Sequence, residues 1–261
     1  MGIVNVTPDS FSDGGMHASA KSALRHCEQL LGEGADLLDI GGESTRPGSP
    51  AVSLEEELAR VLPVVREAVF LGVPVSVDTY KPEVMRAVLD LGADIVNDVW
   101  ALRRPGAQDV VARHATCGVC LMHMHRDPQT MQVAPMEGDV VPAVANFLSE
   151  AAQALRARGV DAARIAIDPG IGFGKTVAQN FALLARQGEL AGLGHPLLAG
   201  WSRKSSLGTV TGIENAGGRM VPSVAAAVLA VERGARIVRV HDVRDTVAAL
   251  AVWRAMRRET S

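Results

Sequence analysis

The sequence is poor in aromatic residues, in cysteine and in long apolar runs, and each shortage excludes a class of protein. Phe, Trp and Tyr make up only 3% of the 261 residues, so we expect a core built from aliphatic side chains. No apolar run approaches the ~20 residues of a membrane span, and the N-terminus lacks the basic, apolar and small-residue pattern of a secretory signal. We therefore expect no membrane partner and a cytoplasmic location.

Cysteine and charge narrow the choice further. The 3 cysteines, an odd number without a secretion signal, indicate reduced thiols. Cys117 and Cys120 precede His123 and His125, a spacing that suggests a zinc site. Since that stretch is typical of a strand, Cys120 would point away from both histidines, and we favour structural thiols. The net charge of -3, without a basic block, argues against a nucleic-acid partner.

Short apolar runs recur along the chain, and nearly every one ends at a polar or charged residue. The runs are 2–6, 37–40, 75–77, 95–96, 119–122, 165–167, 197–200 and 237–240. Buried parallel strands read as continuous apolar runs. The pattern predicts an α/β fold, a (β/α)8 TIM barrel that spans 1–261 as a single domain. A Rossmann or flavodoxin-like sheet is the alternative, but it would need a Gly-rich phosphate turn after the first run.

Helical spacing fills the gaps between these runs. The predicted helices are 18–33, 53–71, 82–91, 107–114, 139–158, 177–186, 219–232 and 243–257. Ser53 followed by Glu56 predicts a capping box at the start of the second helix. The segments EGADL, LGADI and RGARI place Gly34, Gly92 and Gly234 where a helix would end in a left-handed cap, directly before a strand.

Three loops are too rich in functional side chains to be simple connectors: 7–16, 41–50 and 123–138. Long loops on the catalytic face of a barrel are usually lids or binding loops. The segment PGIGFGKT (169–176) looks like a P-loop, which needs glycine, four residues, then Gly-Lys-Ser/Thr. Here Gly170 precedes Gly174 by one residue too few and Pro169 occupies the glycine position, so we expect no nucleotide site.

Several short motifs occur in order from Met1 to Val243 and carry a family resemblance. They are MGIVNVTPDSFSDGG, DIGGESTRPG, VSVDTYKP, IVNDV, LMHM, DPGIGFGKT, GWSRKS and VRVHDV. Together they resemble the dihydropteroate synthase family. The resemblance implies condensation of 6-hydroxymethyl-7,8-dihydropterin pyrophosphate with 4-aminobenzoate to give 7,8-dihydropteroate and pyrophosphate. It also implies Mg²⁺ as cofactor and a homodimer that takes small-molecule substrates.

Polar strand ends suit the recognition of a pterin. The ring is a flat array of donors and acceptors, so it needs matched carboxylate and amide groups in an apolar pocket. Asp78, Asn97 and Asp168 follow three of the apolar runs, whose ends meet at one barrel mouth, and they are similar to the family's pterin-binding groups. The resemblance adds four further pterin-binding positions: Met122, Phe173, Gly200 and Lys204.

The leaving pyrophosphate needs cations and hydrogen-bond donors. The positions that resemble the family's diphosphate site are Asn5, Thr45, Arg46, Arg239 and His241. Arg239 and His241 share strand parity and so face the same side. Their strand adjoins the first strand in a closed barrel, which brings Asn5 within reach. Arg46 offers a planar fork for phosphate oxygens, and Asn5 is the best candidate for a Mg²⁺ ligand.

The resemblance places Phe11 and Pro47 around the aminobenzoate ring, and Ser205 at the start of a helix that receives the carboxylate. The expected catalytic residues are Asp13, Arg46, Asp168 and Lys204. The hypothesised mechanism is dissociative, because anion stabilisation removes pyrophosphate first and a neutral arylamine then attacks the cationic pterin. Asp13 would stabilise the positive charge that develops at the pterin methylene.

Some roles and alternatives stay open. Asp39 and Asp98 are either functional or buried structural acids, and His123 and Arg203 are favoured as structural. A pterin-dependent methyltransferase shares the barrel and pocket but has no need for an anion site. A pterin-binding paralogue without turnover should have lost the first loop, the second loop or Lys204, which are all present. The family often has Gln-Gly where this chain has His125 and Arg126, and a short segment before the first strand. We expect the catalytic face to be unaffected.

Overall fold

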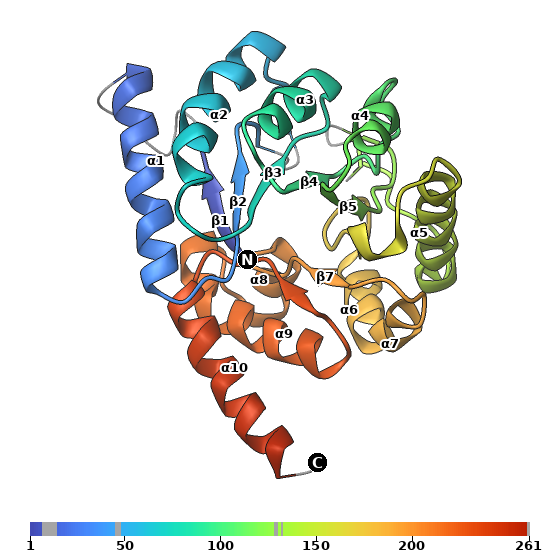
Figure 1. Cartoon of the computed structure of the whole chain (residues 1–261). Helices are drawn as coiled ribbons and strands as arrows, with labels where there is room; N and C mark the ends of the chain where they lie inside the picture. The colour runs from blue at the N-terminus through green and yellow to red at the C-terminus, as the bar shows by residue number, and fades with distance from the viewer. Residues whose placement is uncertain (7–14, 45–47, 128–129, 132, 260–261) are drawn as a thin grey trace.

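The strands of the protein form a ring that helices surround, as Figure 1 shows. The computed structural model describes residues 1–6, 15–44, 48–127, 130–131 and 133–259. The strands are β1 (Gly2–Asn5), β2 (Leu38–Gly41), β3 (Val75–Asp78), β4 (Ile95–Asp98), β5 (Gly118–Met122), β6 (Ile165–Asp168), β7 (Leu198–Ala199) and β8 (Ile237–Val238). Each predicted run therefore overlaps a strand.

Two sheets make up the ring, and single bridges join them at both seams. Strands β1 to β6 pair in parallel in chain order, and β7 pairs in parallel with β8. Parallel bridges link Gly2 to Val240 and Ile167 to Leu197. The backbone N–H of Ile3 donates to the Val240 carbonyl at 3.0 Å, so the hydrogen bonding runs around the whole ring. The predicted α/β barrel is confirmed.

The helices cover the outside of the ring. They are α1 (Gly15–Gly32), α2 (Leu54–Ala68), α3 (Pro82–Asp90), α4 (Ala107–Arg113), α5 (Val140–Ala157), α6 (Val177–Ala185), α7 (Gln187–Ala191), α8 (Ser205–Thr211), α9 (Met220–Glu232) and α10 (Val243–Arg258). Short 3-10 turns lie at Ala162–Arg164 and Ala216–Arg219. Each predicted helix is present within a few residues of its expected bounds, whereas spacing alone missed α7 and α8, and only the family resemblance placed a helix start at Ser205. Among the described residues, no helix is both long and apolar enough to cross a bilayer.

The three glycines predicted to cap helices do so. Gly34, Gly92 and Gly234 have φ values of 97°, 99° and 99°, a region that other residues rarely adopt. At each site the next residue's N–H bonds back across the last helical turn, for example from Ala35 to the Leu30 carbonyl at 2.9 Å. These caps end α1, α3 and α9 and start the following strands at once.

Only one of the two hydrogen bonds of the predicted capping box forms at the start of α2. The Ser53 hydroxyl accepts from the Glu56 N–H at 3.1 Å, as expected. The Glu56 carboxylate instead pairs with Arg60 on the next turn. A cationic partner four residues on competes with the backbone for that side chain. A complete box forms at α6, where Thr176 and Gln179 exchange both bonds.

The core is aliphatic, as the composition predicts, and it lies both between helices and strands and inside the barrel. Cys120 is buried inside the barrel with Met1 and Leu198. Cys117 lies in a different cluster, among residues of α4, α5 and their strands. The His123 ring packs edge-on against Phe147 of α5, with centroids 4.9 Å apart. Cys120 and His123 thus lie on opposite sides of the barrel wall, as strand alternation predicts.

Candidate active site

The carboxyl ends of the strands gather most of the predicted site residues that the structure describes. Asp78, Asn97 and Asp168 are the buried ends or near-ends of β3, β4 and β6, with 9%, 5% and 7% of their surface exposed. Asp78 lies opposite Asn97 in the sheet register, and Met122 lies opposite Asp168. Since all the strands are parallel, these side chains meet at one mouth of the barrel.

Arg239 ties the carboxylates of this mouth together. Its Nε donates to Asp39 Oδ2 at 2.5 Å, and its Nη2 donates to Asp78 Oδ2 at 2.9 Å. Burial works against the charge of Arg239, but Asp39 and Asp78 outweigh it and raise its pKa. Burial also raises the pKa of Asp78 to about 7, although Arg239 opposes this shift. The diphosphate role of Arg239 therefore stays a prediction, since its guanidinium is engaged inside the barrel.

Asp39, whose role the sequence left open, is a structural hub. It is fully buried. Besides the Arg239 bond, its carboxylate accepts from the Ser76 hydroxyl at 2.6 Å and from Asn97 Nδ2 at 3.2 Å. A buried carboxylate with this many donors is fixed in place. Asp39 thereby orients two predicted site residues, Asn97 and Arg239.

Asp98 and His123 also have structural positions. The Asp98 carboxylate accepts from the Trp100 and Leu102 N–H groups at 2.8 and 2.7 Å, and so holds a turn in which Leu102 has a φ of 57°. Burial raises the pKa of Asp98 to about 6. Burial lowers the pKa of His123 to about 3, and the nearby Lys175 charge adds to this effect. The His123 imidazole is therefore neutral at physiological pH.

An apolar cluster forms the other part of the mouth. Met122 and Phe173 pack together with Val99, Met124 and Met131. The Lys204 ammonium lies 4.3 Å from the centroid of the Phe173 ring, within the range of a cation–π contact. The structure thus brings two predicted pterin walls and Lys204 into one group.

Asp168 lies beside this apolar cluster. Its carboxylate accepts from the Gly170 N–H at 2.7 Å. Burial raises the pKa of Asp168, while that hydrogen bond and the Lys204 charge oppose the shift. A Cβ placed on Gly200 would lie 3.9 Å from Asp168 Oδ2, so this predicted pterin position adjoins the carboxylate.

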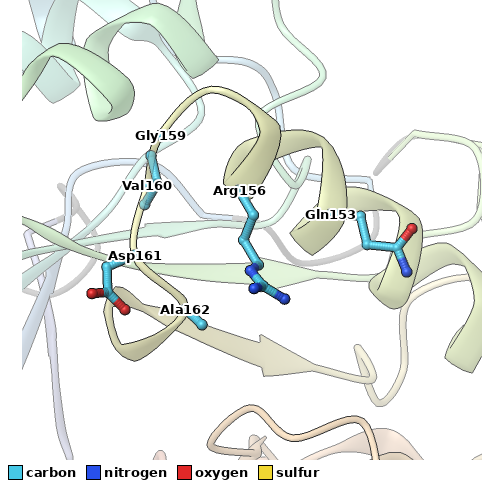
Figure 2. A pocket seen from close by; sticks show the side chains of 6 residues that line it. All are labelled: Gln153, Arg156, Gly159, Val160, Asp161 and Ala162. Carbon is cyan, nitrogen blue, oxygen red and sulfur yellow. The ribbon is translucent and has the colours of Figure 1, made fainter.

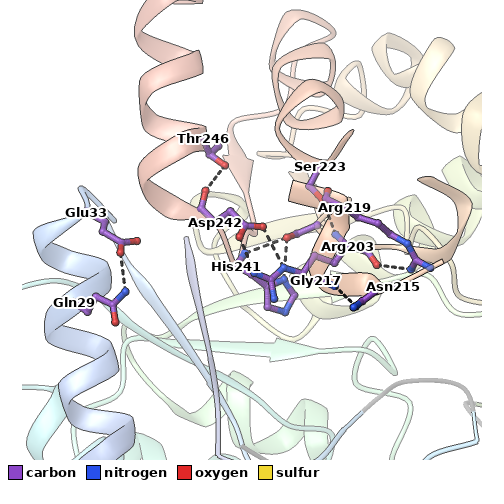
Figure 3. A network of polar contacts seen from close by, with 11 residues as sticks. Gln29, Glu33, Arg203, Asn215, Gly217, Arg219, Ser223, His241, Asp242 and Thr246 are labelled. Carbon is purple, nitrogen blue, oxygen red and sulfur yellow. Dashed lines mark hydrogen bonds and ion pairs between the residues drawn. The ribbon is translucent and has the colours of Figure 1, made fainter. Parts of the chain in front are cut away.

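A polar network surrounds the predicted anion residue His241 at the start of α10, as Figure 3 shows. The His241 N–H donates to Ser202 Oγ at 3.1 Å, and Ser202 Oγ lies 2.9 Å from His241 Nδ1. Arg203 pairs with Asp242 through Nε and Nη2, at 3.2 and 2.6 Å. Arg203 also has a φ of 59°, which its partners hold in place. This pairing supports a structural role for Arg203 and fixes the loop that carries Lys204.

Two surface hollows differ in their relation to the mouth. One, of about 400 Å³, lies between α1 and the start of α10 and is bordered by His241 and Arg203. The other, of about 510 Å³, is shown in Figure 2 and is lined by Gln153 and Arg156 of α5 and by 159–162. Residues 159–162 lead into β6, so the second hollow lies at the opposite end of the barrel from the predicted site.

Several predicted residues lie outside the described part of the chain: Phe11, Asp13, Thr45, Arg46 and Pro47. The stem of the second loop is described and is firmly held. Glu43 accepts from the Tyr80 hydroxyl at 2.9 Å and from Lys81, which also pairs with the buried Glu57 of α2. The Gly42 carbonyl accepts from Arg60 Nη1 at 2.8 Å.

Asn5 and Ser205 occupy the positions that their predicted roles need. Asn5 ends β1 and is half-buried, and the adjoining Gly2 to Val240 bridge places β1 beside the segment that carries Arg239. Ser205 begins α8 and is exposed. Their ligand roles remain predictions.

Sequence reasoning missed two groups around the site. It did not single out Lys175, which appeared only as part of a false P-loop, nor the Glu43, Lys81 and Glu57 group. The signal for Lys175 is a lysine one residue before a helix cap, in the glycine-rich loop that follows a strand end. The signal for Lys81 is a lysine just before a first-turn proline. Neither pattern reveals burial, which depends on distant segments.

The barrel carries buried carboxylates, an amide and an apolar wall at its mouth, and these features place the protein in the pterin-binding class. The family described as "Pterin binding enzyme" matches residues 1–241. The dihydropteroate synthase of Neisseria meningitidis serogroup B is 54% identical over 261 residues, covering 98% of this chain and 92% of the relative.

Solved structures agree. That of Xanthomonas albilineans dihydropteroate synthase with 4-aminobenzoic acid has a TM-score of 0.92 and 55% identity, covering 98% of this chain and 92% of that one. That of Burkholderia cenocepacia dihydropteroate synthase complexed with 7,8-dihydropteroate has a TM-score of 0.91 and 54% identity, covering 100% and 91%. The chain belongs to the dihydropteroate synthase family. This membership decides against the methyltransferase alternative.

Proposed function

We propose that this protein condenses 6-hydroxymethyl-7,8-dihydropterin pyrophosphate with 4-aminobenzoate to give 7,8-dihydropteroate and pyrophosphate. The observation that carries the proposal is the meeting of three buried polar groups, Asp78, Asn97 and Asp168, at one barrel mouth. They lie next to an apolar wall that holds Phe173 beside Lys204. The relatives named above, one solved with 4-aminobenzoic acid and one with 7,8-dihydropteroate, support the same conclusion.

The polar groups suit the edge of a pterin ring. A carboxylate accepts two hydrogen bonds from adjacent N–H groups, and an amide both donates and accepts. Asp39 and Arg239 hold Asn97 and Asp78 in position before a ligand arrives. The face of the ring would lie against Met122 and Phe173, since thioether and aromatic surfaces suit a flat ring.

The diphosphate would be held by His241 and Arg239, by Thr45 and Arg46 of the second loop, and by Asn5. The Asn5 side chain offers a hard oxygen donor at the end of β1, which fits Mg²⁺ together with phosphate oxygens and water. Mg²⁺ would neutralise charge on the leaving diphosphate. Chelation by EDTA should abolish turnover, and restored Mg²⁺ should recover it. Full turnover in EDTA would contradict the metal assignment.

The reaction needs no protein nucleophile. The bond between the pterin methylene carbon and the diphosphate oxygen breaks, and its electron pair leaves with the diphosphate. The lone pair of the arylamine then forms the new carbon–nitrogen bond, and the amine loses one proton. Lys204, beside the Phe173 ring, would contact the pterin between the two substrates. Asp13 would face the developing positive charge, Phe11 and Pro47 would hold the aminobenzoate ring, and Ser205 would receive its carboxylate.

We propose a homodimer formed through α9 and α10. The two helices pack against each other and expose large apolar side chains: Val221 69%, Leu229 45%, Val252 72% and Met256 51%. Apolar side chains this exposed on neighbouring helices favour contact with a second copy of the chain. Sedimentation should show a dimer, and a monomer at working concentration would reject this assignment. A cytoplasmic location is proposed with it, because the cysteines are free and buried.

The test of function is a pyrophosphate-release assay with both substrates and Mg²⁺. Release should require 4-aminobenzoate. Lys204→Ala should lower turnover by about 10²–10³-fold, as expected for a lost electrostatic group at the reacting centre. Lys21→Ala makes the same change at an exposed lysine of α1 and serves as the control. Release that is indifferent to 4-aminobenzoate would reject the proposed function, and full turnover in Lys204→Ala would remove that residue from the site.

A further inference from the structure

The loop that joins β6 to α6 carries a lysine for which the proposed reaction has no use. Lys175 is only 3% exposed. Its Nζ lies 2.9 Å from His123 Nδ1, 2.9 Å from the Gly170 carbonyl and 3.2 Å from the Phe173 carbonyl. These acceptors are neutral, and they belong to two different segments, the end of β5 and the β6–α6 loop. The lysine therefore fastens the loop to the neighbouring strand.

The backbone of this loop depends on such fastening. Gly170, Gly172 and Gly174 have φ values of 68°, 85° and 72°, so the loop follows a path without a strand or helix ladder. A Cβ on Gly170 would lie 1.9 Å from the His123 carbonyl oxygen, which shows how closely the loop approaches β5. The Gly170 carbonyl accepts from the Phe173 N–H at 3.1 Å, and the Phe173 carbonyl accepts from the His125 N–H at 3.5 Å. Lys175 gives each of these carbonyls a second donor and links both to the His123 ring.

The other side of the loop is tied to the turn that carries Lys204. Asn180, 1% exposed, accepts from the Gly172 N–H at 2.9 Å and donates to Ser206 Oγ of α8 at 3.0 Å. A Cβ on Gly172 would lie 3.3 Å from Lys204 Cδ. The loop thus lies between two anchors, and Phe173 occupies its centre beneath Lys204.

The Lys175 cluster is satisfied in either charge state. Burial lowers the pKa of Lys175 to about 7, although Asp168 opposes the shift and Lys204 adds to it. As an ammonium it has three N–H donors, which are shared among His123 Nδ1 and the carbonyls of His123, Gly170 and Phe173. As an amine it keeps two donors for the carbonyls, and its lone pair accepts from Nδ1–H in the other tautomer of His123. The fastening does not depend on which state is present.

We infer that Lys175 is a positioning residue for the pterin site, which holds the β6–α6 loop so that the Phe173 ring faces the pterin beside Lys204. The inference rests on the proposed function, because it assigns the pterin to this wall. Lys175 itself is covered by the loop and only 3% exposed, so we assign it no direct contact with substrate. Its removal should therefore loosen the pterin wall and leave the chemistry at the other residues intact.

The experiment compares the full-length Lys175→Met variant with the full-length wild-type protein. The pterin pyrophosphate is titrated alone by fluorescence, and both KM values and kcat are then measured. The pterin Kd and KM should rise by about 10–100-fold, the size expected when a binding group is displaced by about 1 Å. The KM for 4-aminobenzoate should change far less. Lys175→Gln retains an amide donor and should give an intermediate pterin Kd.

Thr176→Ala is the matched control, because it removes the α6 cap one residue away without touching the loop carbonyls. It should lower Tm and leave the pterin Kd unchanged, which separates positioning from general destabilisation. If Lys175→Met does not fold, the pterin Kd of Lys175→Gln decides. An unchanged pterin Kd in the folded variant, with normal wild-type turnover, overturns this inference alone. Absent pyrophosphate release by the wild type overturns the proposed function instead.

Discussion

The two sides of the barrel mouth hold their buried cations in different ways. On the side of β2, β3 and β8, Arg239 pairs with Asp39 and Asp78, and Lys81 pairs with Glu43 and Glu57. On the side of β5 and β6, the partners of Lys175 are an imidazole and backbone carbonyls. On the first side carboxylates neutralise the buried cations, and on the second side neutral dipoles surround the buried lysine.

The difference appears in the pKa values of the two lysines. Burial disfavours the charge of Lys81, but the hydrogen bonds that it donates to Glu43 and Glu57 outweigh burial and raise its pKa. For Lys175, burial prevails and lowers the pKa to about 7. A carboxylate partner fixes the charge, whereas neutral dipoles leave it adjustable. The paired side therefore provides a rigid frame, and the dipolar side holds Lys175 without a carboxylate in direct contact.

The largest expected effect comes from breaking the paired side. Lys81→Met would leave Glu57, of which 1% of the side chain is exposed, as a buried carboxylate without its cation. Removing one partner of a buried ion pair costs about 3–5 kcal/mol of stability. Urea unfolding at neutral pH should show this loss.

The double variant Lys81→Met, Glu57→Gln tests the cause of that loss. Replacing the orphaned carboxylate by an amide should return a good part of the lost free energy of unfolding, because the buried charge is gone. Equal stability of the single and double variants would mean that Lys81 acts by packing alone. The two sides of the mouth would then be less different than their partners suggest.

The next effect is the pH dependence of stability that Lys175 contributes. Between pH 7.5 and 8.5 the unfolded chain holds a proton on this lysine, whose ordinary pKa is 10.5, while a folded-state pKa of about 7 leaves most molecules unprotonated. The unfolded state thus binds more protons, so stability rises with pH, by about 1 kcal/mol per pH unit. Below pH 7 both states are protonated and this slope ends.

Lys175→Met tests this slope, because it removes the lysine and leaves the other titrating groups in the protein. The difference in unfolding free energy between the wild type and the variant should change with pH in this window. Lys81 should give no slope there, since its raised pKa leaves it protonated in both states. Parallel stability curves would show that Lys175 stays charged when folded, and its side of the mouth would then resemble the other.

The sequence predicted which residues lie at the barrel mouth better than it predicted which of them pair with each other. Strand ends such as Asp78, Asn97 and Asp168 follow apolar runs, so their place at the mouth is set by local pattern and barrel topology. Glycine caps at Gly34 and Gly92 were equally visible, because the required backbone conformation has a residue signature. These features need only neighbours in the chain.

The pairing depends on contacts between distant segments and could not be read in this way. Arg239 meets Asp39 across 200 positions of the chain. Several acids lie at or near strand ends, and the sequence does not show which of them pairs with Arg239. Lys175 meets His123 across 52 positions, and its burial results from a glycine-rich loop folding over it. The capping box at Ser53 failed for the same reason on a smaller scale, since Arg60 takes the Glu56 carboxylate.

The smallest effect compares the helix starts on the two sides. Thr176 at α6 has a complete capping box, whereas Ser53 at α2 has only the backbone half. Loss of an N-cap costs ~1 kcal/mol. Thr176→Ala removes a cap whose partner Gln179 also donates to the Met136 carbonyl at 2.7 Å. It should destabilise less than Ser53→Ala, because the backbone N–H of residue 176 still donates to Gln179 Oε1 and keeps half of the box. Urea unfolding of both variants gives the comparison. An equal or larger loss for Thr176→Ala would show that the two side-chain bonds of Gln179 do not hold the start of α6 without the hydroxyl, and that both helix starts depend on their caps to the same degree.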